Sequence, residues 1–271
     1  MRDMNRIAQR LAALKEQQAA AFIPFITGGD PDLSGSEDIA VTLAEQGADI
    51  IEYGVPYSDP VGDGIVIQEA SLRALAQGVT LRKILVSVER IRKRSDVPLM
   101  LFSYLNPILS YGVERFARDA AAAGADGVLC VDLPPDDAED YRNALKANNL
   151  ESIFLAAPTS TDARLQFIGS ATGSFVYYIS RLGVTGEQAA LSTGLAAAVA
   201  RVREQCGKPV AVGFGISTPE QAHEVAGAAE GVVVGSAIVR LIAQKAGAPD
   251  MLRTVAEFAR HLAEAIKKGN I

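Results

Sequence analysis

Short runs of apolar residues recur along the chain, and amphipathic stretches separate them. The runs are apolar at successive positions rather than at alternate ones, which is typical of parallel strands that helices cover on both sides. The pattern predicts eight strands, near residues 20–26, 49–53, 97–102, 126–131, 151–156, 174–179, 209–213 and 231–234. It predicts helices between them, near residues 36–46, 112–123, 136–148, 161–170, 188–205 and 218–227.

The alternation of these units predicts an α/β fold, a closed (β/α)₈ TIM barrel, in a single domain that spans residues 1–271. An open doubly wound sheet is the alternative, and the nearly even spacing of the units favours closure. Residues 3–15 place three aliphatic side chains on one face of an extra N-terminal helix, which we expect to plug the bottom of the barrel. Residues 249–268 show a similar pattern and predict a C-terminal helical extension packed outside the barrel.

Composition narrows the class of protein. The 271 residues are 49% hydrophobic with a formal charge of −6, which argues against a nucleic-acid partner because such a surface needs a basic stripe. No apolar run approaches the length of a membrane span, and the N-terminus is charged from its second residue, so we expect a cytoplasmic protein with no membrane partner. Cys130 and Cys206 lack metal-ligand spacing, and we expect free thiols. His223 and His261 fall on outer helices, where we expect no catalytic role.

The most informative stretch is residues 49–64. An apolar strand runs up to Glu52, and a loop rich in glycine and proline follows at once with Asp59 and Asp63. Burial raises the pKa of a carboxylate towards neutrality, where it can give and take a proton, whereas a carboxylate on a wetter loop stays ionised. Two carboxylates in unlike environments predict an acid/base pair. Each of these residues also has a structural alternative. Glu52 could form a hydrogen bond with a neighbouring hydroxyl, and Asp59 could stabilise a turn. Asp63 could be the N-cap of a helix that starts near Ile65.

In this fold, functional groups gather at the C-terminal ends of the strands. Glycine-rich turns follow the last two predicted strands, at 213–220 and 235–239, and they predict a phosphate site, with plain tight turns as the alternative. A long segment of small and polar residues, 180–194, is typical of a lid or binding loop, although an ordinary connection is also open. Of Tyr177 and Tyr178 before it, one should point into the barrel and one towards the helices.

The predicted strand ends lack the residues that two other kinds of catalysis require. No lysine lies at the C-terminal end of a predicted strand, which disfavours a Schiff-base aldolase. No cluster of His, Asp or Glu has metal-ligand spacing, so we expect no metal. Carbon–carbon bond chemistry in this barrel would therefore rest on carboxylates.

Short motifs run along the whole chain, at residues 25–31, 52–60, 63–64, 106–107, 132–135, 157–160, 183–186, 213–217 and 235–239. In residues and in order they resemble those of the tryptophan synthase α subunit family. The resemblance implies a lyase of tryptophan biosynthesis that cleaves indole-3-glycerol phosphate to indole and glyceraldehyde 3-phosphate. It also implies a β subunit as partner in an αββα heterotetramer, which receives indole through a tunnel. Pyridoxal phosphate is then expected in that partner, and no cofactor in this chain.

The resemblance further implies roles for single residues. Glu52 matches the family's general acid/base, Asp63 the carboxylate that bonds the indole N–H, and Tyr177 a tyrosine at the edge of the substrate. The phosphate-binding positions match Gly186, Gly215, Gly235 and Ser236, with Thr185 beside them. The indole-pocket positions match Phe25, Phe102, Leu129, Leu155, Phe214 and Val234. Positions that couple the strand ends to the lid match Asp59, Asp132 and Thr185.

The chain departs from the family pattern at Gly62 and Ile65, where the family more often has Ala and Pro. We expect these two departures to affect how well the loop is ordered and how it signals to the β subunit. Phe102 stands where a smaller group is found, which changes the pocket volume. Three other functions stay open. They are another phosphate-binding barrel enzyme (an isomerase or epimerase), a non-catalytic subunit that activates a β partner, and a lyase that releases indole alone. The first generally uses paired Asp, Cys/Asp or metal ligands, where this chain offers Glu52 and Asp63.

Overall fold

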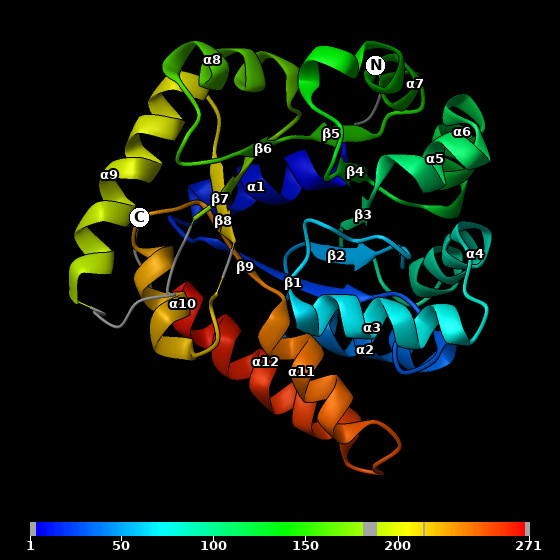
Figure 1. The fold of residues 1–271 in the computed structure, drawn as a ribbon. Helices are drawn as coiled ribbons and strands as arrows, with labels where there is room; N and C mark the ends of the chain where they lie inside the picture. The colour runs from blue at the N-terminus through cyan, green and yellow to red at the C-terminus, as the bar shows by residue number, and fades with distance from the viewer. Residues whose placement is uncertain (1–3, 181–188, 214, 269–271) are drawn as a thin grey trace.

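The computed structural model describes residues 4–180, 189–213 and 215–268, and nine parallel strands form its centre (Figure 1). The strands are β1 (Ala21–Thr27), β2 (Ile51–Gly54), β3 (Leu99–Ser103), β4 (Gly127–Cys130), β5 (Glu151–Ile153), β6 (Leu155–Ala156), β7 (Val176–Ile179), β8 (Val210–Gly213) and β9 (Gly231–Val234). Their order in the sheet is β5-β4-β3-β2-β1-β9-β8-β7-β6.

The two ends of this sheet meet in one short stretch of chain. β5 and β6 are parts of a single predicted strand, near 151–156, which is interrupted at Phe154. β5 pairs with β4 and β6 pairs with β7, and the Tyr177 N–H donates to the carbonyl of Phe154 at 3.1 Å. The predicted (β/α)₈ TIM barrel is therefore confirmed, with its fifth strand in two parts.

Helices cover the outside of the barrel, as Figure 1 shows, whereas α1 (Arg6–Glu16) lies across one end of it. The outer helices are α2 (Leu33–Glu45), α3 (Ile65–Ala76), α4 (Leu81–Arg92), α5 (Leu105–Tyr111), α6 (Val113–Ala123), α7 (Glu139–Ala147), α8 (Asp162–Ala171), α9 (Ala189–Cys206), α10 (Pro219–Ala226), α11 (Ser236–Lys245) and α12 (Met251–Lys267), with a 3-10 turn at η1 (Pro135–Asp137). Each predicted helix is present within a few residues of its expected bounds, whereas α4 and α5 were not predicted.

Apolar side chains form two layers, one inside the barrel and one between strands and helices. Ile23 of β1 lies in the inner layer and its neighbour Phe22 in the outer one, because successive side chains of a strand point to opposite faces. The same alternation turns Tyr177 inwards and Tyr178 towards the helices, as predicted. Alternation along each strand thus decides which residues can reach a cavity inside the barrel.

The terminal helices lie where the sequence analysis expected them. Ile7 and Leu14 of α1 are buried in the inner layer with Leu11 packed against it, so α1 closes the barrel at the N-terminal ends of the strands. α12 packs against α10, α2 and α11 on the outside of the barrel (Figure 1). These two helices cover two different sides of the same sheet.

Four acidic residues join neighbouring strands where the strands begin. Asp49, Asp126, Glu151 and Glu230 each accept a hydrogen bond from a backbone N–H within two residues of the start of a neighbouring strand, at 2.7 to 2.8 Å. Asp49, Asp126 and Glu230 also form ion pairs with arginines. The N-terminal end of the barrel is therefore held by carboxylates that have all found partners.

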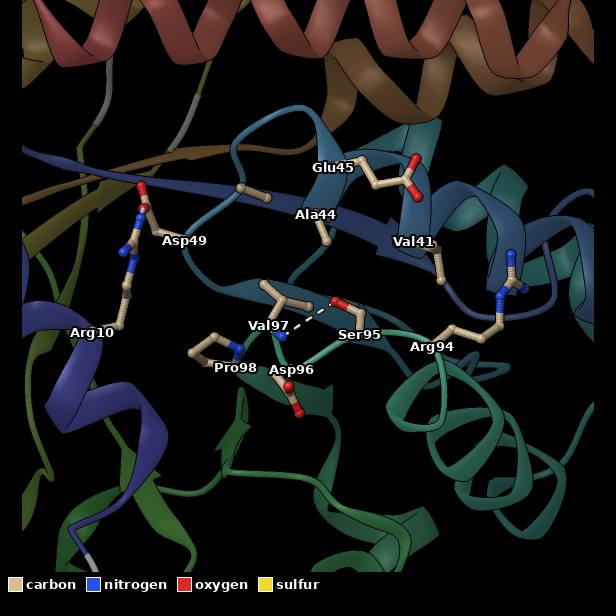
Figure 2. Close-up of a pocket in the computed structure, with 11 residues that line it drawn as sticks. Arg10, Val41, Ala44, Glu45, Asp49, Arg94, Ser95, Asp96, Val97 and Pro98 are labelled. Carbon is tan, nitrogen blue, oxygen red and sulfur yellow. Dashed lines mark hydrogen bonds and ion pairs between the residues drawn. The ribbon is translucent and has the colours of Figure 1, made fainter.

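Asp49 shows how these contacts tie distant segments together. Its Oδ1 accepts from Arg10 Nε of α1 at 2.8 Å, while its Oδ2 accepts from the Phe22 N–H at 2.7 Å and lies 2.6 Å from Lys267 Nζ of α12. Figure 2 shows Arg10 and Asp49 facing each other at one end of a cavity of about 360 Å³ on this side of the barrel. Because the Asp49 side chain is fully buried, these bonds anchor both terminal helices to β1 and β2.

We expect Asp49→Asn to lower the free energy of unfolding by about 3 kcal/mol, because it removes a buried anion while Arg10 and Lys267 keep their charges. Asp38→Asn is the matched control, since it breaks an Asp–Arg pair whose side chains are 44% and 45% exposed and should cost less than about 1 kcal/mol. Urea unfolding of the three proteins measures both losses. An equal loss of unfolding free energy in the two variants would show that burial of the Asp49 ion pairs does not add to their effect on stability.

Candidate active site

A cavity of about 300 Å³ lies at the C-terminal ends of the strands. Nine of the predicted site residues line it: Phe25, Glu52, Asp63, Phe102, Leu155, Tyr177, Gly215, Gly235 and Ser236. They come from β1, β2, β3, β6 and β7 and from the segments that follow β2, β8 and β9, so closure of the barrel brings them together. Three more predicted residues, Thr185, Gly186 and Phe214, lie outside the described part of the chain.

Glu52 occupies β2 between Phe25 of β1 and Met100 of β3. It is 1% exposed, and neither oxygen of its carboxylate has a hydrogen-bond partner among the residues that the structure describes. Burial raises the pKa of Glu52 to about 8, and the negative charge of Asp63 adds to this rise. At neutral pH the group therefore holds a proton that it can donate into the cavity and later recover.

Asp63 lies on the loop between β2 and α3 and faces the same cavity. Burial raises the pKa of Asp63 to about 6, while a hydrogen bond from the Tyr104 hydroxyl opposes the rise. The group is thus mostly ionised at a pH where Glu52 is protonated. The N-cap interpretation of Asp63 is wrong: Gly64 occupies the N-cap of α3, and the Asp63 carbonyl instead accepts from Gln68 Nε2 at 2.8 Å.

Tyr104, which the sequence analysis did not single out, supports the Asp63 loop. Its hydroxyl oxygen accepts a hydrogen bond from the Gly62 N–H at 3.0 Å. A Cβ atom at Gly62 would lie 3.0 Å from Val131 Cγ1 and 3.1 Å from Tyr104 Oη, so the absence of a side chain there allows the close approach. Tyr104 directly follows β3, at the end of the barrel where functional groups are expected, and that position was the available signal.

Tyr177 points into the cavity from β7. Its hydroxyl lies over Gly213 of β8 so closely that a Cβ atom at Gly213 would be 2.4 Å from Tyr177 Oη. Burial raises the pKa of Tyr177 well above its ordinary value, and the charges of Glu52 and Asp63 raise it further. The phenol therefore stays protonated and presents a hydrogen-bond donor near the two acids.

An aromatic wall forms the apolar side of the cavity. Phe25 and Phe102 meet edge to face, with ring centroids 5.1 Å apart and an angle of 76° between the planes. A Cβ atom at Gly54 would lie 2.7 Å from Phe25 Cζ, so glycine at this position makes room for the ring. Leu155 and Val233 extend the wall, which suits a flat apolar group.

Glycines and a helix end form the other side. Gly215 has a φ of +76°, a conformation that favours glycine, and Gly235 is the N-cap of α11 without a side-chain hydrogen bond to the first turn. The N–H groups of that turn and the helix dipole suit an anion. Arg240, which the sequence analysis missed, also lines the cavity. It follows Ser236 by four residues on the same helix, and this spacing was the signal that could have found it.

Four predicted residues lie away from the cavity lining. Leu129 is buried in the inner layer of the barrel, and Val234 belongs to the outer layer, so that Val233 takes its place at the cavity. Asp59 is exposed and accepts from Ser58 Oγ at 2.5 Å. Asp132 accepts from the N–H of Leu105, the first residue of α5, at 2.7 Å.

Other kinds of site find little support in the part of the chain that the structure describes. No group of three or more His, Cys, Asp or Glu residues there is arranged to hold a metal ion. None of the helices placed by the structure is long and apolar enough to cross a bilayer. Cys130 and Cys206 are both buried free thiols, as expected.

The fold and this geometry define a TIM-barrel protein with two carboxylic acids, Glu52 and Asp63, in a cavity at the C-terminal ends of its strands. Residues 11–267 match the family model described as tryptophan synthase alpha chain. The tryptophan synthase alpha chain of Geobacter sulfurreducens is 51% identical over 263 residues, which cover 97% of this chain and 99% of that protein.

Solved structures agree with this match. Tryptophan synthase subunit alpha from Legionella pneumophila str. Paris superposes with a TM-score of 0.91 at 37% identity, covering 98% of this chain and 99% of that one. A chain of Mycobacterium tuberculosis tryptophan synthase gives a TM-score of 0.88 at 37% identity, again over 98% and 99%. The chain belongs to the tryptophan synthase alpha chain family, and the resemblance seen in its motifs is confirmed.

We expect the stability of Glu52→Gln relative to the native chain to increase with pH. The folded chain binds the Glu52 proton with a pKa of about 8 and the unfolded chain with one near 4.5, so the contribution of this group to native stability is fully present below pH 4.5 and is lost as the pH rises through 8. Glutamine has no such dependence. At about 1.4 kcal/mol per pKa unit, the variant should gain on the order of 3 kcal/mol on the native chain between about pH 5 and pH 8.5.

Urea unfolding of both proteins across this range measures the gain. Glu89→Gln serves as the control, because its hydrogen bond with Lys93 lowers the pKa of Glu89 below 4.5, so its difference from the native chain should not change across this range. A difference between Glu52→Gln and the native chain that does not change with pH would contradict a buried, protonated Glu52.

Proposed function

We propose that Glu52 and Asp63 carry the reaction of the family in this chain, the cleavage of indole-3-glycerol phosphate to indole and glyceraldehyde 3-phosphate. The observation that carries this proposal is the buried Glu52 carboxylate, without a described partner, beside an aromatic wall and a second carboxylate. A protonated acid that faces an apolar cavity is suited to protonate a carbon atom of an aromatic ring.

The proton leaves one atom of the substrate and reaches another. Glu52 donates its proton to C3 of the indole ring, and positive charge develops at the ring nitrogen. The resulting carboxylate takes the proton of the adjacent side-chain hydroxyl, whose oxygen becomes the aldehyde oxygen of glyceraldehyde 3-phosphate. The bond between C3 and the side chain breaks, and its electron pair returns to the ring, which leaves neutral indole. Glu52 ends protonated, as it began.

Asp63 and Tyr177 act on the charge that develops. Ionised Asp63 accepts the indole N–H and stabilises the positive ring, and a fixed charge aimed at a developing charge is worth most where water is excluded. The protonated Tyr177 hydroxyl lies near both carboxylates and orients the substrate at its edge. Phe25, Phe102 and Leu155 hold the ring, and the turns at Gly215 and Gly235 with Ser236 hold the phosphate.

The assembly and location of the chain follow the family. Its partner is the β subunit, which carries pyridoxal phosphate, and no cofactor belongs to this chain. We infer an αββα complex in the cytoplasm, with residues 1–271 as a single domain. Asp59 and Asp132, with Thr185, are proposed to link the cavity to this partner. The two aspartates lie on the loops that follow β2 and β4, and the same loops carry the cavity residues Asp63 and Val131.

Glu52→Gln should lower the turnover of indole release by about two to four orders of magnitude, because the amide keeps the size of the side chain but cannot transfer the proton. The KM for indole-3-glycerol phosphate should change little. Glu89→Gln, on the exposed face of α4, is the matched control and should behave like the native chain. Indole is measured with and without added β subunit, and an unchanged turnover in Glu52→Gln would rule out the proposed proton transfer.

Gly235→Asp should raise the KM for indole-3-glycerol phosphate by at least about tenfold, because it places a negative charge where the phosphate is proposed to bind. Gly235→Ala controls for the added Cβ, which would meet Phe25 Cβ at 3.4 Å, an ordinary contact, and should raise KM much less. Steady-state kinetics of the two variants separate charge from bulk. The same KM for both variants would show that the phosphate does not bind at the start of α11.

A further inference from the structure

Arg240 is the one cationic residue among the described residues that line the cavity. The cavity also holds two acids, Glu52 and Asp63, so an ion pair across it would be an ordinary outcome. No hydrogen bond or ion pair joins Arg240 to any residue placed by the structure, and its side chain is exposed at the mouth. The charge of Arg240 is therefore not used to neutralise the acids.

The position of Arg240 on α11 directs its side chain towards the start of the helix. α11 begins at Ser236, and residues four apart lie on the same face of a helix, one above the other. Long side chains on a helix lean towards its N-terminus. The guanidinium group is thus carried towards the N–H groups that follow Gly235, at the edge of the same cavity.

A cation in this place is unfavourable unless an anion joins it. The N-terminal end of a helix carries partial positive charge, which disfavours a second positive group close to its free N–H groups. The first turn of α11 contains no acidic residue, and Gly235 supplies no side-chain cap. The exposed N–H groups, the helix dipole and Arg240 all favour the same occupant, an anion with several acceptor oxygens.

We propose that Arg240 binds the phosphate group of the substrate and thereby selects phosphorylated over unphosphorylated indole-glycerol. This inference rests on the proposed function for the identity of the substrate, but the phosphate contact itself does not depend on the reaction. Arg240 is a specificity-determining residue rather than a catalytic one, since the reacting atoms lie at Glu52. Its contact with the phosphate also fixes which end of the substrate enters towards the acids.

Arg240→Ala tests the proposal in the full-length chain by two independent measurements. Calorimetric titration with inorganic phosphate should give a dissociation constant about tenfold higher than that of the native chain. In the presence of the β subunit, the KM for indole-3-glycerol phosphate should rise by a similar factor with kcat nearly unchanged. The rate with unphosphorylated indole-glycerol should stay the same, so the ratio of kcat/KM for the two substrates should fall about tenfold.

Two further variants make the result specific. Arg240→Lys keeps the charge and should recover part of the phosphate affinity, although it loses the paired hydrogen bonds of the guanidinium group. Arg253→Ala removes an arginine that is 71% exposed on α12, outside the cavity, and should match the native chain in both measurements.

The possible results separate this inference from the proposed function. Unchanged phosphate affinity and an unchanged substrate ratio in Arg240→Ala would overturn the role of Arg240, and so would an equal loss of kcat on both substrates without loss of phosphate affinity. If the native chain releases no indole while Arg240→Ala still binds phosphate more weakly, the proposed reaction fails but the phosphate contact stands.

Discussion

The Glu52 carboxylate lies inside the barrel without a described hydrogen-bond partner, and the chemistry of the cavity depends on that position. An ionised carboxylate there would cost far more than a neutral one, so the group keeps its proton up to a pH of about 8. The pleat of β2 imposes this burial. The next residue, Tyr53, faces outwards, and its hydroxyl lies 2.8 Å from Ser36 Oγ and 2.7 Å from Ser87 Oγ. One strand thus presents a satisfied polar group to the helices and an unsatisfied one to the cavity.

Carboxylates have opposite tasks at the two ends of the barrel. Where the strands begin, Asp49 and Asp126 each accept a backbone N–H and bind two cationic side chains, so their charges are fully used in holding segments together. Where the strands end, Glu52 and Asp63 have no cationic partner among the described residues, and mutual repulsion contributes to the raised pKa of Glu52. The ion pairs where the strands begin stabilise the fold, and this stability allows two unpaired acids to lie close together where the strands end, as is common at functional sites.

Periodicity predicted the barrel because eight strands apolar on both faces leave little choice of fold, and Glu52 stood out as the charged residue of such a strand. Details that depend on a shift of one residue along the chain were harder to predict from the sequence. Val233 rather than Val234 reaches the cavity, since neighbours in β9 face opposite layers and both are valine. Asp63 carries the right residue type for an N-cap, but Gly64 takes that place. For Arg240 the spacing of four residues from Ser236 was the one available signal, because only closure of the barrel brings α11 to the cavity.

Phe25 lies between the anion side of the cavity and the strand that carries Glu52. A Cβ atom at Gly235, by the proposed anion site, would touch Phe25 at Cβ, whereas one at Gly54, two residues beyond Glu52, would collide with Cζ at the tip of the ring. The phenyl group therefore spans the distance from the anion side to the acid strand. An apolar spacer of this kind cannot screen or bridge the charges, and Arg240 makes no ion pair with either acid. A substrate that is flat and apolar in the middle, with an N–H at one end and an anion at the other, can satisfy both ends only in one orientation.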